Sequence, residues 1–502
     1  MKGKKIVCAL LSGIFAFSVC AFTACGGGIE KDYAYVSEDL SEKNANELEN
    51  LATYSAFYKP QDGSRVGDTM PFYENGVYHI FYLKDGGGTS SHPVYRVDTT
   101  DFVHYEEKGL ALPAGDSNSG EAMIGTGSIV KHGGDYLFFY TGHPATGAET
   151  VRVAVSEGNL DSFVKKEDFI LSPAEYGFAD DFRDPEVRWS ETDECYYCIV
   201  STRKNDRAVL AQFTLNERLQ VLGAPRILYT DTRGFNVLEC PTYFEWNGRY
   251  YITYSAQDLN MGDTDELTVS SYALNGSKGC MYYLISENPF EGWRAPANPQ
   301  LDSKVFYAGK AVRGSDTMLV GWAAQRDVNA TYKYAWGGNL TAHRLVQNED
   351  GVLSLTYPQA YAAHFDVKQP LLLKNQAGEA ANSLSLISSN SLFNPVANEK
   401  LEYRFSMNVN FSSDVSEFGL VFGLKDNLYD AVKVTINPLA GKIKAQYGQN
   451  SEIANNFLAL EADTDYRIDV FAEGSNFVLY IEGVAFTFKV RNVGNRRIAL
   501  FA

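Results

Sequence analysis

Cysteine and basic residues are both scarce in this 502-residue sequence. Its seven cysteines are too few for a disulfide scaffold, and the Cys-x-x-Cys pair at 195–198 has no second cysteine or histidine pair at ligand spacing. With 44 Lys and Arg against 62 Asp and Glu, the formal net charge is -18. This balance argues against nucleic acid as a partner, because nucleic-acid binding needs a basic face.

Long amphipathic helical patterns are also hard to find. From residue 51 onward, aromatic and β-branched runs alternate with Gly, Asn and Asp turns, which is typical of strands. The chain is 45% hydrophobic and 13% aromatic, enough for a large packed core. The sequence therefore predicts an all-β protein.

The N-terminus has the pattern of a targeting segment. Three lysines in the first five residues precede an apolar run, and "FTAC" at its end resembles the bacterial lipobox. We predict a lipoprotein signal peptide at 1–24, a lipidated Cys25 and a charged tether over 25–50. The protein would then be extracytoplasmic, a bacterial cell-surface lipoprotein that meets the membrane only through its lipid anchor. A plain signal peptide or an uncleaved anchor remains open.

One unit recurs five times between residues 51 and 364. It consists of an apolar strand, a tight polar turn and a second apolar-aromatic strand, as in "MPFYENGVYHIFYL" and "PTYFEWNGRYYITYSA". Repetition at 56 to 67 residues is typical of propeller blades, and it predicts a five-bladed β-propeller over 51–364. The turns are centred on Gly76, Gly134, Thr192, Gly248 and Ser315.

Three acids fall at matched places in this repeat. Asp68 and Asp184 lie 8 residues before the turns of units one and three, and Glu239 lies 9 before that of unit four. Each starts the first strand of its blade. Innermost strands of a propeller line the central channel, so their equivalent ends converge. We predict that the three carboxylates face one another across a pocket, although three unrelated strand-start acids remain the alternative.

These residues resemble glycoside hydrolase family 32, the β-fructosidases. "FRDP" at 182–185 matches the family's Arg-Asp-Pro motif, "ECP" at 239–241 its Glu-Cys motif, and "GDTMPF" at 67–72 takes the place of Asn-Asp-Pro-Asn-Gly. "FYAGKAV", "VGWA" and "WGGNL" resemble its fifth-blade signatures. The resemblance covers about residues 60 to 360, with the motifs in the family's order.

The resemblance implies a role for each acid. Asp68 would be the nucleophile, Glu239 the general acid/base, and Asp184 the carboxylate that stabilises the transition state by binding sugar hydroxyls. A retaining glycosidase needs one ionised carboxylate to attack and one protonated carboxyl to donate. This scheme requires no metal and no cofactor, and its partner is an oligo- or polysaccharide.

Five further residues are predicted to bind the substrate. Arg183 adjoins Asp184. Thr126 and Ser128, in the second unit, and Tyr307, in the fifth, take the place of the acids in blades without one. Trp336 precedes a Gly-Gly turn and is the best placed of five tryptophans to stack on a sugar.

Several positions depart from the family pattern. Gly67 replaces the asparagine before the nucleophile, and "SRV" stands where the family has an upstream tryptophan. Leu83 replaces a glutamine, and the Phe-Ser-Gly-Ser element reads "IGTGS" at 124–128. Because these positions shape the fructose pocket, the departures leave open a different furanose or an unusual linkage.

The C-terminal part, residues 365–502, changes character. Its strand patterns alternate with a period of two, but the acid-bearing unit is gone, and we predict a β-sandwich domain. Without a tryptophan in it, a structural domain is favoured over a sugar-binding module.

The leading hypothesis is a secreted, surface-tethered glycoside hydrolase. It would cleave β-fructosidic bonds in levan, inulin or sucrose-type oligosaccharides with retention. An arabinan- or xylan-cleaving furanosidase of the related propeller families is the second hypothesis. A non-catalytic glycan-binding lipoprotein, motivated by the altered pocket residues, is the third.

Overall fold

The computed structural model describes residues 6–9, 39–42, 54–86, 91–258, 280–326, 334–365, 367–369, 373–374, 380–381, 383–386, 402–423, 431–447, 451–490 and 498–501. Cys25, the predicted lipidation site, and most of residues 1–50 lie outside these ranges. No helix among the described residues is long and apolar enough to cross a membrane.

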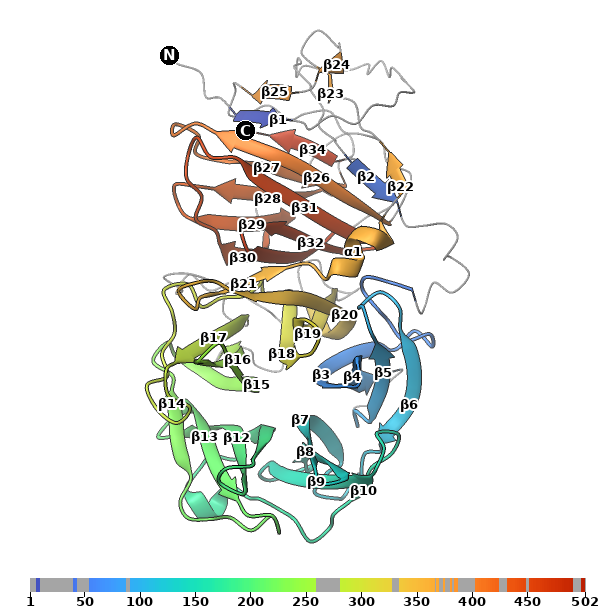
Figure 1. Ribbon diagram of the computed structural model, residues 1–502, viewed down its shortest axis with the longest axis vertical. Coiled ribbons are helices and arrows are strands. Elements are labelled where there is room, and N and C mark those ends of the chain that lie inside the picture. The colour runs from blue at the N-terminus through green and yellow to red at the C-terminus, as the bar shows by residue number, and fades with distance from the viewer. Residues whose placement is uncertain are drawn as a thin grey trace. The chain divides into compact units, whose positions relative to one another are not determined.

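A five-bladed β-propeller is formed by residues 47–361, which confirms the predicted architecture (Figure 1). Each blade is antiparallel, and its first two strands are joined by the predicted turn. The blades are β3 (Arg65–Glu74), β4 (Val77–Asp85), β5 (Val94–Thr99) and β6 (Glu106–Leu112); β7 (Met123–His132), β8 (Asp135–His143), β9 (Thr150–Glu157) and β10 (Val164–Lys165); β11 (Phe182–Ser190), β12 (Cys195–Lys204), β13 (Arg207–Leu215) and β14 (Arg226–Thr230); β15 (Phe235–Trp246), β16 (Arg249–Asp258) and β17 (Met281–Ser286); β18 (Phe306–Arg313), β19 (Thr317–Arg326), β20 (Tyr334–Gln347) and β21 (Leu353–Thr356).

The ring is closed by its first and last blades. Strand β20 pairs with β3 through Gly338 and Val66, so the blade that begins the ring is hydrogen-bonded to the blade that ends it. In the fourth blade, isolated bridges from Tyr282 to Gln300 and from Ile285 to Arg294 extend the sheet beyond β17. A 3-10 turn at Ala174–Tyr176 precedes β11.

The first strand of every blade carries a β-bulge. Pairing with the second strand shifts between Val66 and Thr69, Gly125 and Gly127, Arg183 and Glu186, Glu239 and Thr242, and Tyr307 and Lys310. A bulge adds one residue to the strand, bends it and redirects its side chains. All three acids lie in or directly before a bulge, so this recurring irregularity is what aims them.

A second recurring feature braces the bulges. In four blades, one residue of the second strand pairs with the last residue of the first strand before the bulge. This second-strand residue forms a hydrogen bond with the first strand of the next blade. The contacts are Asp184 N–H to Thr141 Oγ1 at 2.8 Å, Ser201 Oγ to Leu238 O at 2.5 Å, Ala308 N–H to Ser255 Oγ at 2.9 Å, and Trp322 Nε1 to Asp68 Oδ1 at 3.0 Å.

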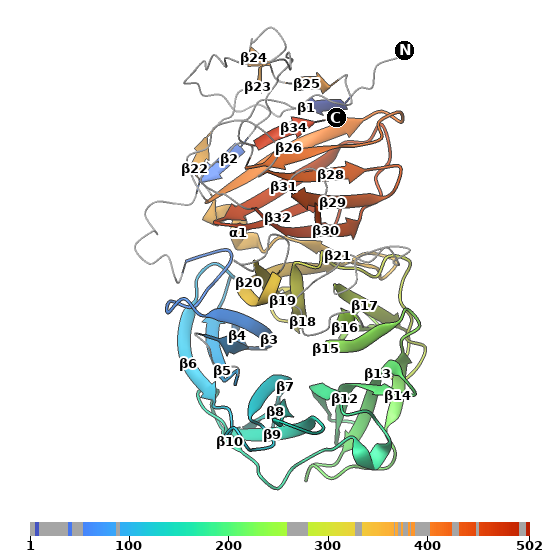
Figure 2. The ribbon, with the colours of Figure 1, turned by 180° about the vertical axis from the view of Figure 1, so that it is seen from behind.

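The sandwich predicted for the C-terminal part is confirmed as two antiparallel sheets (Figure 2). Phe422 of one sheet meets Phe477 and Phe488 of the other, with ring centroids 5.2 and 5.4 Å apart. One sheet contains β22 (Val367–Gln369), β25 (Ser383–Leu386), β26 (Glu402–Phe411), β31 (Tyr466–Glu473), β32 (Asn476–Ile481) and β33 (Val484–Lys489); the other contains β27 (Phe418–Phe422), β28 (Val432–Asn437), β29 (Lys442–Tyr447), β30 (Ser451–Phe457) and β34 (Ile498–Phe501). Helix α1 (Gln359–His364) precedes it, and β23 (Leu373–Lys374) pairs with β24 (Ala380–Ala381).

Two short strands lie in the segments predicted as signal and tether. β1 (Ile6–Ala9) pairs with β25 and β26, and β2 (Asp39–Glu42) pairs with β22 and β26. The tether interpretation did not foresee β2, because strand pairing uses backbone groups and needs no apolar periodicity. The apolar run that suggests a signal also suits a strand.

Candidate active site

The three predicted acids meet around one residue, Cys240. Its backbone N–H donates to Asp184 Oδ2 at 2.8 Å, and its Sγ lies 3.6 Å from Thr126 Oγ1, which donates to Asp68 Oδ2 at 2.7 Å. Glu239 precedes it in the chain. Burial, and after it the charges of all three acids, raise the pKa of the Cys240 thiol well above its usual value. The thiol is therefore a packed neighbour of the acids and a poor nucleophile.

Asp68, the predicted nucleophile, is held by two donors. Thr126 of β7 donates to one carboxylate oxygen at 2.7 Å, and the Trp322 indole of β19 donates to the other at 3.0 Å. Both donors come from other blades. Hydrogen bonds to both oxygens fix the orientation of the carboxylate, which is what a nucleophile at this position requires.

Asp184 is buried, with 3% of its surface exposed, and has a left-handed backbone at φ 57°. Few non-glycine residues adopt this conformation without a local reason. Here the Asp184 N–H donates to Thr141, and Oδ2 accepts from Cys240. Burial and the nearby Glu239 raise the pKa of Asp184 to about 7, against the opposing effect of Arg183.

Glu239, the predicted acid/base, accepts three hydrogen bonds. Arg183 Nη1 lies 2.9 Å from Oε1, Gln257 Nε2 lies 3.3 Å from Oε1, and the Tyr307 hydroxyl donates to Oε2 at 2.6 Å. Burial raises the pKa of Glu239, as do Asp68 and Glu149, and this outweighs the lowering by Arg183 and Tyr307. A raised pKa is what a carboxyl that donates a proton near neutral pH requires.

Arg183 is surrounded by carboxylates. Its Nε donates to Glu149 at 2.7 Å, its Nη1 to Glu239 at 2.9 Å and its Nη2 to Asp181 at 2.6 Å. These neighbours raise the pKa of the guanidinium even though burial lowers it. Arg183 lies beside the acids as predicted, but its donors are engaged by the protein itself.

The other predicted binding residues divide into two groups. Thr126 and Tyr307 each donate to one of the acids. Ser128 connects blades 2 and 3, because its hydroxyl donates to Pro185 O and accepts from Val187 N–H, both at 2.9 Å. The hydroxyl is thus occupied by backbone groups, which is a structural role that the sequence did not indicate. Sugar binding by Thr126, Ser128 and Tyr307 stays a prediction.

Trp336 is half-buried and close to the nucleophile. Its ring stacks on His92 with centroids 4.4 Å apart and planes 16° apart, and it meets Trp322 edge-on at 6.0 Å. It also covers Gly67, where any Cβ atom would overlap three carbons of the indole. The glycine at the place of the family's asparagine therefore makes room for the indole of Trp336. The face of this indole that lies against His92 is not free to stack on a sugar.

A Gly67→Asn variant is expected to unfold more easily, by about 1–3 kcal/mol, because it overpacks the site against Trp336. Gly67 does not have a positive φ, so backbone strain does not contribute. Urea unfolding of a double-mutant cycle with Trp336→Ala measures the coupling. If Gly67→Asn costs the same with and without the indole, Trp336 is not the reason for the glycine.

Sequence reasoning missed several residues that contact the site. Trp322 and Gln257 bind the acids directly, and Glu149 binds Arg183. His143 also belongs to this group, because its Nδ1 lies 2.9 Å from Glu149 Oε1. Trp322 lies in the fifth-blade element "VGWA", which was the available signal for it.

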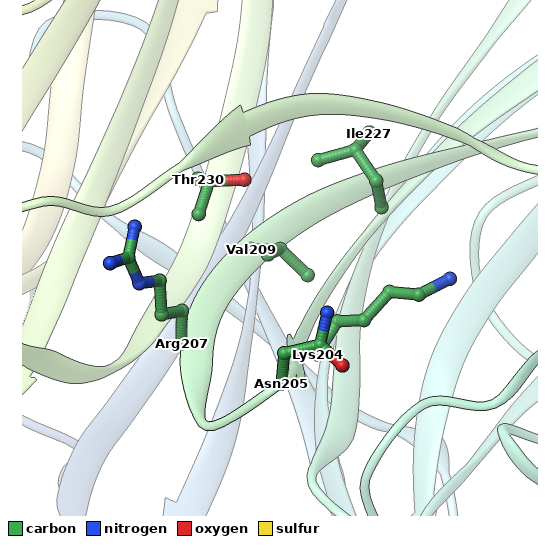
Figure 3. Close-up of a pocket in the computed structure, with 6 residues that line it drawn as sticks. All are labelled: Lys204, Asn205, Arg207, Val209, Ile227 and Thr230. Carbon is green, nitrogen blue, oxygen red and sulfur yellow. The ribbon is translucent and has the colours of Figure 1, made fainter.

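A separate hollow lies on the outer strands of blade 3 (Figure 3). Its volume is about 440 Å³, and the residues that line it are Lys204, Asn205, Arg207, Val209, Ile227 and Thr230. None of them is an acid, and none belongs to a first strand. The carboxylate cluster, with its nucleophile and acid geometry, is therefore the candidate active site.

Comparison with known proteins gives concordant results. The family model "Glycosyl hydrolases family 32 N-terminal domain" matches residues 67–357. The sucrose-6-phosphate hydrolase of Vibrio alginolyticus is 23% identical over 331 residues, which is 63% of this chain and 66%, just under two thirds, of that protein.

Two solved structures share the fold. The sucrose-6-phosphate hydrolase of Lactobacillus gasseri superposes with a TM-score of 0.66 at 18% identity, covering 90% of this chain and 91% of that one. Fructan 1-exohydrolase IIa of Cichorium intybus, in complex with 1-kestose, gives 0.67 at 15%, covering 89% and 94%. The family match spans more than half of the chain and includes all three acids, and the predicted resemblance is confirmed: the chain belongs to glycoside hydrolase family 32.

Proposed function

We propose that the protein is a retaining β-fructofuranosidase that hydrolyses β-fructosidic bonds in sucrose-type oligosaccharides or fructans such as levan and inulin. One observation carries this proposal. Asp68, Asp184 and Glu239, from three different blades, converge around Cys240 in a chain of this family. Proteins with the same fold are named as a sucrose-6-phosphate hydrolase and a fructan 1-exohydrolase.

The proposed reaction has two steps. Asp68 attacks the anomeric carbon of the fructosyl unit and displaces the leaving oxygen, which takes the proton of Glu239. Glu239, now ionised, removes a proton from water, and the hydroxide displaces Asp68 to release fructose with retained configuration. Thr126 and Trp322 hold Asp68 in position for the attack. No metal or cofactor takes part in this scheme.

Asp184 is proposed to bind sugar hydroxyls. Its Oδ2 is occupied by the Cys240 N–H, and among the described residues Oδ1 has no hydrogen-bond partner. A carboxylate beside the reacting carbon also favours the positive charge of an oxocarbenium-like transition state. The backbone bonds of Asp184 hold it in place for both tasks.

The charge of the site favours a neutral substrate over a phosphorylated one. Even with Glu239 protonated, as the first step requires, Asp68, Asp184 and Glu149 outnumber the one arginine among them. Arg183 already donates to Glu149, Asp181 and Glu239. A phosphate group at these residues would meet repulsion, because the one cation described among them is already engaged by carboxylates. We therefore propose sucrose or fructans, and not sucrose 6-phosphate, as substrates.

A substrate panel tests this function. Residues 26–502 are incubated with sucrose, sucrose 6-phosphate, inulin, levan and arabinan, and products are separated by chromatography beside a Glu239→Gln control. Fructose from an unphosphorylated substrate, absent from the control, supports the proposal. Arabinose from arabinan points to the furanosidase alternative. Oligosaccharide binding without any product identifies a glycan-binding protein.

We further propose that Cys25 is lipidated and tethers the protein to the outside of a bacterial membrane. Support comes from the lysines, apolar run and "FTAC" element of the sequence. In a bacterial host, Cys25→Ala is expected to move the protein from the detergent-extracted membrane fraction to the soluble fraction or to leave an uncleaved precursor. Mass spectrometry of the N-terminus checks the lipid, and an unmodified Cys25 in the wild type would contradict the proposal.

A further inference from the structure

Glu149 is a largely buried acid for which the proposed reaction has no direct use. It lies in the loop before β9, and only 13% of its side chain is exposed. Its backbone N–H donates to Asp180 O at 3.0 Å, which ties this loop to the segment before β11. Its side chain makes three more contacts, one through Oε1 and two through Oε2.

These contacts form a chain from blade 2 to the general acid. His143 Nδ1 lies 2.9 Å from Glu149 Oε1, while Glu149 Oε2 accepts from Phe182 N–H at 2.9 Å and from Arg183 Nε at 2.7 Å. Arg183 Nη1 then donates to Glu239 Oε1 at 2.9 Å. The ring of His143 covers Gly125, where a Cβ atom would overlap Nε2. Both oxygens of Glu149 are thus held.

The electrostatic consequence concerns Glu239. An arginine that donates to a carboxyl favours its ionised form, and an ionised Glu239 cannot donate a proton to the leaving oxygen. A second carboxylate behind the guanidinium offsets part of that charge. The pKa of Glu149 is lowered, because His143 and Arg183 outweigh the effect of burial, so Glu149 carries its charge when the enzyme is at neutral pH.

We propose that Glu149, supported by His143, is a positioning residue of the active site: it orients Arg183 toward Glu239 and offsets the guanidinium charge at the general acid. The inference rests on the proposed function for the role of Glu239. Asp181 also binds Arg183, but 33% of its side chain is exposed, and solvent weakens its influence.

Other ionisable groups face Glu239 and remain in place. They are Asp68 on β3, Asp184 beside Arg183 on β11, Cys240 on β15 itself and Tyr307 on β18. Asp184 and Glu239 interact strongly, so their protons leave in steps that belong to the pair. The effect of Glu149 must therefore be measured as a change in the titration of this pair.

Glu149→Gln retains the size of the side chain and removes its charge. The pKa of Glu239 should fall by about one unit. Because Glu239 acts in its protonated form, the alkaline limb of the pH profile of kcat/KM should move to lower pH by the same amount. Asp181→Asn, which neutralises the exposed partner of the same guanidinium, is the matched control and should move it less. Glu149→Asp keeps the charge and should lie nearer the wild type.

Infrared titration of the protonated carboxyl band gives a readout that does not need turnover, with Glu239→Gln used to assign the band. An unchanged midpoint in folded Glu149→Gln overturns the inference. If the wild type has no activity, the proposed function is wrong. The infrared titration midpoint still shows whether Glu149 affects the pKa of Glu239.

His143 provides a second test if Glu149→Gln does not fold. His143→Ala should lower kcat about 10-fold with a smaller change in KM, because Arg183 is less well oriented. His143→Asn, whose amide can replace Nδ1 as a donor, should recover most of the loss. If kcat stays at the wild-type value in both variants, His143 and Glu149 have no positioning role.

Discussion

An Asp68→Asn variant is expected to lose at least about 10⁴-fold in kcat on a β-fructoside while remaining folded. The amide cannot form the ester to the fructosyl unit, so the first chemical step is lost. The oxygen that remains can still accept from Thr126 or Trp322, whose donors lie 2.7 and 3.0 Å from the carboxylate. The measurement is initial-rate fructose release, with circular dichroism to verify the fold.

Asp180→Asn is the matched control for this variant. Asp180 is an exposed acid in the loop before β11, so neutralising it tests the general effect of lost charge near the site. Its kcat should stay near the wild-type value. Comparable activity in Asp68→Asn and wild type would show that another group attacks the sugar, and the assignment of the nucleophile would be wrong.

Glu239→Gln has the second-largest expected effect, a loss of about 10²–10⁴-fold on sucrose, because glutamine has no proton to donate. The loss should depend on the leaving group. An aryl fructoside whose phenol leaves readily needs little protonation, so its first step should be much less impaired. The second step then lacks a base, and azide, which needs none, should restore turnover and form fructosyl azide.

Chromatography and mass spectrometry of the products check this prediction. Glu245→Gln, which changes an exposed glutamate on the same strand β15, is the control and should behave as the wild type. If Glu239→Gln is equally impaired on sucrose and on the activated fructoside, and azide has no effect, Glu239 is not the acid/base residue.

The propeller could be predicted from the sequence because its repeat has a clear local signature. The turns at Gly76, Gly134, Thr192 and Gly248 follow apolar strands at intervals of 58, 58 and 56 residues, and each lies at a strand connection in the structure. Counting back from the turns also identified the acids, since each blade repeats the same backbone path. A position in one blade is thus informative about the same position in the next.

The rest of the site could not be predicted in this way, because it depends on contacts between residues distant in sequence. Glu149 lies in a loop outside the repeating strands and meets Arg183 only after blades 2 and 3 pack together. The role of Gly67 depends on Trp336, which follows it by 269 positions in the chain. Ser128 lies in the expected blade, but its hydroxyl is hydrogen-bonded to the backbone of Pro185 and Val187 in the next blade.

The recurring bulge has a consequence for how such an enzyme can change over evolution. Every inner strand carries the bulge, whereas only three blades place an acid there, and the fifth has Ala308 in the left-handed conformation that Asp184 adopts in the third. Hydroxyls of neighbouring blades, Thr141 and Ser255, hold these two bulges by their backbone N–H groups. These two backbone contacts therefore do not depend on which side chain the position carries. New specificities can arise by single substitutions at a bulge, with the ring itself inherited intact.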